Sequence, residues 1–197
     1  MTGKMAAVIL AAGSGRRVGI AKHRLQTGFT TFLQAVVAVV RHAGLSPVVC
    51  VIAPDQRNDV TADTATATTA NDVQIVVNAD PGRGMFSSVI EGIRSVGDCR
   101  AALLFPVDHP FVQGQTVMEL VRRSSEKPDH FIKPAYGGRG GHPVVIPASA
   151  FRAILDAPST SSLRTVIEQC GIPIDRLDVG DRGVIRNINT FEDLHAE

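Results

Sequence analysis

The stretch VILAAGSGRRVGIAKHRL, residues 8–25, places a glycine-rich loop directly after a short apolar run, residues 6–10. That run has the composition of a buried strand, so we expect the loop at the carboxyl end of a strand, where open α/β sheets bind ligands. The glycines leave backbone N–H groups open to phosphate oxygens, and the cations add charged donors. These residues are Gly13, Gly15, Arg16, Arg17 and Lys22. The loop is therefore predicted to bind a polyphosphate; the alternative is a turn with solvated arginines.

The spacing of this loop differs from that of two other phosphate-binding loops. A Walker A loop requires G-x-x-x-x-G-K-[ST], which these residues do not fit. A dinucleotide-binding loop requires G-x-G-x-x-G, whereas the third glycine here, Gly19, comes one residue late. The acid expected at the end of the second strand is also displaced, since Asp55 follows Pro54. A nicotinamide site remains as a weaker alternative.

Apolar runs and amphipathic patterns alternate through the first half of the chain. The runs are residues 6–10, 48–52, 73–77 and 101–105, as expected of strands buried on both faces of a parallel sheet. One helical stripe covers residues 32–40, with Thr31 as N-cap and Gly44 after its end, and a second covers residues 85–96. The alternation predicts right-handed βαβ units in a three-layer, Rossmann-like α/β fold with a mostly parallel sheet.

The second half of the chain has a different pattern. HFIKPAYGGRGGHPVVIP, residues 130–147, indicates two short strands around a glycine-rich connection, so the sheet is expected to be mixed. Helices are predicted near residues 151–155 and 163–170, and strands near residues 174–179 and 184–188. Residues 61–70, TADTATATTA, are a weak helix or a loop. We find no linker and no repeat, and expect one domain over residues 1–197.

Composition and charge exclude several classes of function. The net charge is +1, with no Trp and one Tyr, so neither nucleic acid nor an anionic membrane is an expected partner. No apolar run approaches the ~20 residues that cross a bilayer, and the N-terminus reads as a strand rather than a targeting peptide. Cys50, Cys99 and Cys170 lie far apart without a CxxC pair, which indicates idle thiols in a reducing cytoplasm.

Three further features place polar side chains beside the predicted loop. In ALLFPVDHPFV, Asp108 follows a buried strand, and a buried carboxylate there needs a partner such as Mg²⁺. The alternative is that Asp108 caps a helix. His109 is expected to be a packing or surface residue. Ser87 and Ser88 fall in the first turn of a helix, where N–H groups favour anions, or they belong to an ordinary capped helix. His142 begins a strand that faces the cleft, or is a structural histidine.

LAAGSGRRVGIAK, residues 10–22, resembles the opening signature of nucleotidyltransferases with a glycosyltransferase-A-like (GT-A-like) fold, L-A-[AG]-G-x-[GS]-x-R-[MF]-G-x-x-K. Within that superfamily the chain resembles the MobA-like family, especially its molybdenum cofactor cytidylyltransferase branch. The further matches are GMFSSVIEG (84–92) to G-M-x-x-S-[LV]-x-x-G, DHP (108–110) to D-x-P, and GRGGHPV (138–144) to G-x-x-G-H-P-V. The last family motif, D-[IV]-D-T-P-E-D-L, reads NINTFEDL here, with Asn187 and Asn189 in place of both leading aspartates.

The resemblance implies roles for individual residues. Arg17 would bind the β- and γ-phosphates, Lys22 would stabilise charge at the α-phosphate, and Asp108 would hold Mg²⁺ that arrives with the nucleotide. Asn189 would be a second, weaker metal ligand through its amide oxygen. The nucleotide-binding residues implied are Leu10, Ala11, Ala12, Gly13, Ser14, Gly15, Arg16, Arg17, Lys22, Ser87 and Ser88. Gly141 and His142 would meet the acceptor.

The reaction implied by the resemblance is transfer of CMP from CTP to the phosphate of molybdopterin, with release of pyrophosphate. CTP is expected over GTP because the branches of the family differ at the position of Ala12. One alternative is another small phosphorylated acceptor, such as a sugar, alcohol or phospholactate phosphate. Another is a non-catalytic carrier that hands a cofactor to a molybdoenzyme or its maturation chaperone.

Overall fold

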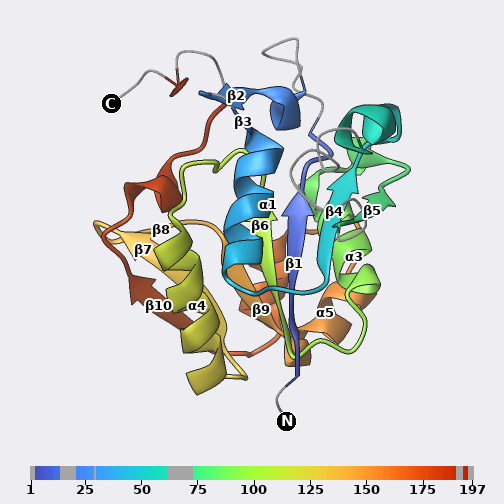
Figure 1. The fold of residues 1–197 in the computed structure, drawn as a ribbon. Helices are drawn as coiled ribbons and strands as arrows, with labels where there is room; N and C mark the ends of the chain where they lie inside the picture. The colour runs from blue at the N-terminus through green and yellow to red at the C-terminus, as the bar shows by residue number, and fades with distance from the viewer. Residues whose placement is uncertain (1–2, 14–20, 29, 62–72, 190–192, 195–197) are drawn as a thin grey trace.

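A computed structural model describes residues 3–13, 21–28, 30–61, 73–189 and 193–194 (Figure 1). Its main sheet has the strand order β10-β7-β9-β6-β1-β4-β5, with β8 paired to β7. The strands are β1 (Met5–Leu10), β4 (Val48–Ile52), β5 (Val73–Val77), β6 (Ala101–Pro106), β7 (Phe131–Tyr136), β8 (Arg139–Gly140), β9 (Val144–Pro147) and β10 (Ile174–Asp178). A separate antiparallel pair joins β2 (Gln26–Thr27) to β3 (Thr30–Thr31).

The pairing confirms a mostly parallel, mixed sheet. Strand β1 lies between β4 and β6 and is parallel to both, and β4 continues in parallel to β5. Strand β9 is antiparallel to β6 and β7, which is where the glycine-rich connection of the second half returns the chain. The carboxyl ends of β1 and β6 consequently meet at one edge of the sheet, and the segments after both strands can form a common site.

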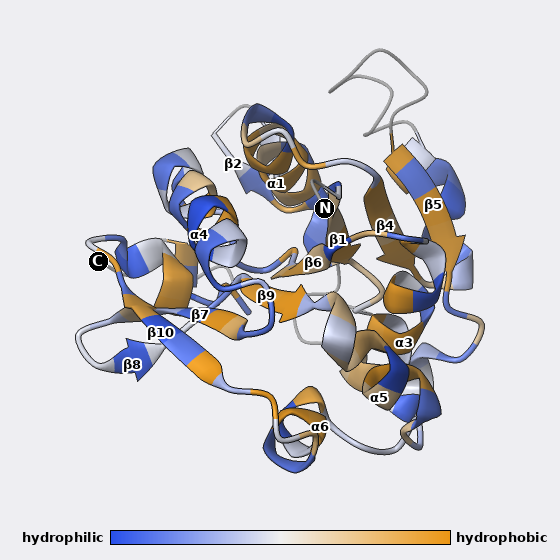
Figure 2. Cartoon of the chain, turned by 90° about the horizontal axis from the view of Figure 1, so that it is seen from below, coloured by the Kyte–Doolittle hydropathy of each residue, from blue (hydrophilic) through white to orange (hydrophobic). Residues whose placement is uncertain are grey.

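Helices cover both faces of the sheet (Figure 2). Helices α1 (Phe32–His42) and α4 (Gly114–Glu126) bury apolar side chains on one face, whereas α3 (Met85–Ser95), α5 (Phe151–Asp156) and α6 (Leu163–Gln169) do so on the other. Strand β1 is buried along its whole length between these layers. The arrangement confirms the predicted α/β fold. Among the described residues no helix is long and apolar enough to cross a membrane.

The caps of α1 agree with the sequence prediction. The Thr31 hydroxyl accepts a hydrogen bond from Gln34 N at 3.2 Å, and the Gln34 side chain accepts one from Thr31 N at 2.9 Å, which completes a capping box. Gly44 follows the last turn with φ of +74°, a conformation that glycine adopts without steric cost. Two of the cysteines are buried, and burial raises the pKa of Cys50 to about 12, as expected of an idle thiol.

The structure differs from the prediction at residues 182–185 and at residues 114–126. The strand expected at residues 184–188 is wrong: residues 182–185 form a short 3-10 helix, η5 (Arg182–Ile185). Its turn is set by Asp181, whose side chain accepts a hydrogen bond from Gly183 N at 2.8 Å. Helix α4 was not predicted, because only Val117 and Leu120 supply large apolar side chains to its buried stripe. Residues 62–70 of the low-complexity stretch lie outside the described residues.

Candidate functional site

A cavity of about 180 Å³ opens where the carboxyl ends of β1 and β6 meet the start of α3. Six of the predicted site residues line it: Leu10, Ala12, Gly13, Lys22, Ser88 and Asp108. The other lining residues are Pro81, Gly84, Met85, Pro106 and Val107. Met85 is 59% exposed, which leaves an apolar side chain available to a ligand at the cavity. Motifs that lie far apart in the sequence therefore share one pocket.

Of the predicted loop, the structure describes Gly13 and Lys22. Ser14, Gly15, Arg16 and Arg17 lie outside the described residues. Ala11 is buried against the layer that contains α1. The described start of the loop is held by Gln56, which the sequence analysis missed: its Nε2 donates to the carbonyl of Gly13 at 3.2 Å, and its Oε1 accepts from Ala53 N at 2.8 Å. Gln56 follows β4, the strand beside β1, and only the sheet order brings it to the loop.

Lys22, Asp108 and Asn189 form the polar centre of the site. The Lys22 ammonium donates to Asp108 Oδ2 and to Asn189 Oδ1, in each case at 2.7 Å. The segment that carries Asn189 is tied to Asp108 through a backbone hydrogen bond from Ile188 N to the Asp108 carbonyl, 2.9 Å long. The backbone N–H of Asn189 in turn donates to Asp193 Oδ2 at 2.7 Å. The two predicted metal ligands thus converge on one cation, the side chain of Lys22.

Asp108 also contacts His109, which is buried and is not the surface residue that the sequence allowed. His109 Nδ1 lies 3.0 Å from Asp108 Oδ1. Burial by itself would raise the pKa of Asp108, but hydrogen bonds from His109 and Lys22, together with their charges, outweigh burial and lower it to about 2. The carboxylate is therefore ionised at neutral pH, and the nitrogen of His109 that faces it acts as the donor.

Gly141 and His142 lie beside this centre. The backbone N–H of Gly141 donates to the Pro134 carbonyl at 2.7 Å, and a Cβ at this position would lie 2.1 Å from the Val184 carbonyl oxygen. Gly141 is thus required for close packing against η5. The His142 ring lies 5.0 Å from that of His109. Burial, aided by the charge of His109, lowers the pKa of His142 to about 4, so its imidazole is neutral at pH 7.

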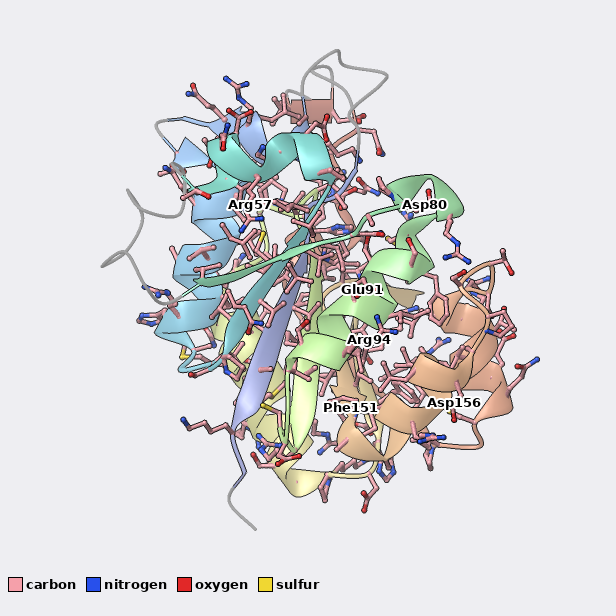
Figure 3. The ribbon with its side chains drawn as sticks, turned by 90° about the vertical axis from the view of Figure 1, so that its right-hand side faces the viewer. Arg57, Asp80, Glu91, Arg94, Phe151 and Asp156 are labelled. Atoms are coloured by element: carbon pink, nitrogen blue, oxygen red, sulfur yellow. The ribbon has the colours of Figure 1, made fainter. Side chains whose placement is uncertain are left out.

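The start of α3 is organised by Asn78, a second residue that the sequence analysis missed. Its Nδ2 donates to Ser87 Oγ at 2.8 Å and to Ser88 Oγ at 2.9 Å, and its Oδ1 accepts from Asp80 N at 3.1 Å. Figure 3 shows this side of the molecule, with Asp80 near the start of α3 and Glu91 farther along the helix. Of the two predicted serines, Ser88 lines the cavity. The hydroxyl of Ser87 instead donates a hydrogen bond to the Gly84 carbonyl at 2.7 Å. The only local signal for Asn78 was its position directly after β5.

Comparison with known proteins places these features in a family. The family described as "MobA-like NTP transferase domain" matches residues 7–174. Three solved structures share the fold: Rv0371c complexed with manganese from Mycobacterium tuberculosis H37Rv (TM-score 0.78, 22% identity, 99% of this chain and 97% of that chain), 4-diphosphocytidyl-2C-methyl-D-erythritol synthase from Anaerococcus prevotii (0.78, 13%, 98% and 93%), and molybdopterin-guanine dinucleotide biosynthesis protein A from Archaeoglobus fulgidus (0.71, 17%, 97% and 95%). No curated protein matches the sequence. Because the family match covers most of the chain and the fold agrees with it, this chain belongs to the MobA-like NTP transferase family.

Proposed function

We propose that this protein is a metal-dependent nucleotidyltransferase that moves CMP from CTP to the phosphate of molybdopterin and releases pyrophosphate. The observation that carries the proposal is the convergence of Lys22, Asp108 and Asn189 at the edge of a cavity between a phosphate-type loop and the start of a helix. A single positive charge, a carboxylate and an amide oxygen at this place suit a triphosphate and its counter-ion.

The proposed reaction is an in-line displacement. A phosphate oxygen of the acceptor forms a bond to the α-phosphorus of CTP, while the bond from that phosphorus to the bridging oxygen of the β-phosphate breaks and pyrophosphate leaves. The nucleophile belongs to the acceptor, so the protein needs to position the two substrates and stabilise charge. Lys22 stabilises the charge that develops around the α-phosphate, and the positive end of the α3 dipole faces polar groups of the nucleotide.

The residues present suit a divalent cation. Asp108 and Asn189 offer two oxygen ligands that already point at a common position, and Mg²⁺ typically takes one or two protein oxygens, leaving the rest to phosphates and water. Asp108 and Asn189 would hold the metal, which when bound neutralises charge on the triphosphate. The manganese complex of Rv0371c supports a divalent cation for this fold. Among the described residues no group of three or more His, Cys, Asp or Glu forms an alternative metal site.

The choice of CTP and of molybdopterin is argued from Ala12 and His142. Ala12, which differs between branches in the family pattern, lines the cavity. We infer that the neutral imidazole of His142, whose ring lies 5.0 Å from that of His109, would meet the phosphorylated acceptor. A fold like that of 4-diphosphocytidyl-2C-methyl-D-erythritol synthase favours a second candidate, cytidylyl transfer to a smaller phosphorylated alcohol.

Pyrophosphate release tests the proposal. CTP, GTP, ATP and UTP would each be incubated with Mg²⁺ and either molybdopterin or a panel of sugar, alcohol and phospholactate phosphates. We expect release with CTP and molybdopterin, and release only with another acceptor would support the second candidate. If no pair yields pyrophosphate while a nucleotide still raises the melting temperature, the protein is a carrier that hands its ligand to a molybdoenzyme or chaperone, and the enzyme proposal is wrong.

A further inference from the structure

Lys22 occupies the position between the two oxygens that would hold a metal. Its Nζ lies 2.7 Å from Asp108 Oδ2 and 2.7 Å from Asn189 Oδ1. The second Asp108 oxygen, Oδ1, faces His109 Nδ1 at 3.0 Å. Every side-chain oxygen of the proposed metal ligands therefore already faces a hydrogen-bond donor of the chain.

An ammonium and a metal ion cannot share this position. Magnesium binds oxygens at about 2.0–2.1 Å, so an ion in contact with Asp108 Oδ2 and Asn189 Oδ1 would take the place of the Lys22 ammonium. Lys22 and Asp108 are also largely shielded from water, with 19% and 17% of their side chains exposed, which strengthens the ion pair relative to one at the surface. A metal ion arriving alone would have to break this pair and leave the lysine without an anionic partner.

We propose that Lys22 keeps the metal site closed until a nucleotide binds, so that the metal is taken up with the nucleotide and poorly without it. The inference rests on the proposed function. A triphosphate offers Lys22 a different anionic partner, so the lysine can leave Asp108 and Asn189 free for the metal. Metal and nucleotide then each raise the affinity for the other, as any two coupled ligands must.

Asn189 contributes to keeping the metal site closed because its side chain carries no charge. Lys22 carries one positive charge, Asp108 one negative charge and Asn189 none, so the charges of these three side chains balance one another. An aspartate at position 189 would leave one uncompensated negative charge, and that charge would attract a divalent cation in the absence of nucleotide. The asparagine therefore gives the site its dependence on the nucleotide.

Binding of Mn²⁺ to the full chain without nucleotide, followed by electron paramagnetic resonance of the free ion, tests the inference. We expect Lys22→Gln and Lys22→Met each to bind Mn²⁺ roughly tenfold more tightly than the wild type, a gain within the range for coupled sites. Lys127→Gln is the matched control, because Lys127, the residue that follows α4, also pairs with a carboxylate, that of Asp175 on β10, away from the site. Unchanged or weaker binding by both folded Lys22 variants would overturn the inference, as would an equal gain in Lys127→Gln.

Two more variants locate the effect. Asn189→Asp should also bind Mn²⁺ without nucleotide about tenfold more tightly than the wild type, and adding Asp108→Asn to Lys22→Gln should abolish the gain. Mn²⁺ should bind more tightly to the wild type with a non-hydrolysable CTP analogue than it binds to the analogue without protein. In Lys22→Gln this gain in affinity should be smaller. If Mn²⁺ binds the wild type equally well with and without the analogue while pyrophosphate is still released, the inference fails and the proposed function stands. If neither the analogue nor any acceptor elicits a response, the proposed function itself fails.

Discussion

At the scale of single residues, the charge of Asp108 is the property on which the site depends. Its carboxylate is kept ionised inside the fold by Lys22 and His109, although burial acts against that state. A group held in its charged form against burial is typical of functional sites, because the surrounding donors have been arranged for it. His109 and Lys22 together orient both carboxylate oxygens.

Asp108→Asn should reduce the rate of pyrophosphate release by roughly 100-fold or more, the size found when one electrostatic contact to the reacting groups is removed. The amide keeps the shape of the side chain and removes the charge that pairs with Lys22 and would bind the metal. The rate would be measured at saturating CTP and Mg²⁺, with circular dichroism to check the fold. Asp178→Asn, an exposed carboxylate on β10, is the control. Full activity of Asp108→Asn would remove Asp108 from the metal role.

His142 leads to a prediction for the pH dependence of stability. Its pKa is lowered from 6.5 to about 4 in the folded chain, so the fold favours the neutral ring, and this contribution is present above pH 6.5 and is lost as the pH falls towards 4. As the pH falls from 6.5 to 4, the free energy of unfolding of the wild type should therefore drop by about 3 kcal/mol more than that of His142→Gln. Urea unfolding at several pH values measures this difference. The exposed His42→Gln controls for the loss of a histidine, and parallel curves for wild type and His142→Gln would contradict the prediction.

At the scale of elements, the seating of α3 on β1 places Ser88 at the cavity. Gly92 lies on the buried face of α3, and a Cβ there would lie 2.3 Å from Val8 Cγ1 of β1 and 3.3 Å from Val51 Cγ2 of β4. The motif glycine therefore serves close helix–sheet packing. The sequence identified the position through a family pattern, and the structure supplies its physical reason.

Gly92→Ala should lower the free energy of unfolding by about 1–2 kcal/mol, because overpacking costs ~1–3 kcal/mol and the better helix propensity of alanine returns at most ~1 kcal/mol. It should also weaken CTP binding, since α3 must move away from the sheet and carries Ser88 with it. Thermal unfolding and calorimetric titration measure the two effects. Gly180→Ala, where a Cβ meets open space, is the control. The double variant Gly92→Ala/Val8→Ala should lose less free energy of unfolding than the two single variants together. A stabilised Gly92→Ala would show that the helix accommodates the methyl group.

At the scale of the whole molecule, Asp181 joins the last part of the chain to α4. Its buried carboxylate accepts hydrogen bonds from Gln113 N at 2.8 Å, Thr116 Oγ1 at 2.9 Å and Gly183 N at 2.8 Å. The segment that follows, through η5, leads to Asn189 beside Asp108. Asp181 thus connects the geometry of the site to the packing of the C-terminal part of the chain.

Asp181→Ala should destabilise the protein by about 3 kcal/mol, because three donors lose their acceptor in a buried place. It should also release the segment that carries Asn189, so Mn²⁺ binding in the presence of the CTP analogue should weaken. Chemical denaturation and electron paramagnetic resonance give the two readings. Asp178→Ala, exposed on β10, should change stability by less than about 0.5 kcal/mol. Equal stability of both variants would show that Asp181 is not the anchor.

The strand–helix alternation and most of the element types could be predicted from the order of the amino acids, because apolar residues repeat with the local period of the element that buries them. The sequence also pointed to Lys22, Asp108 and Ser88, since each follows a strand or begins a helix, whereas Asn189 came from the resemblance to the last family motif. Only the tertiary structure decided that Lys22 bonds Asn189, 167 positions away, and that His109 faces Asp108. A hydrogen bond between residues as distant as Lys22 and Asn189 leaves no pattern in either segment, and the packing around His109 decides which way its ring faces. The role of Gln56 depends likewise on which strands lie side by side, because β4 and β1 are neighbours in the sheet.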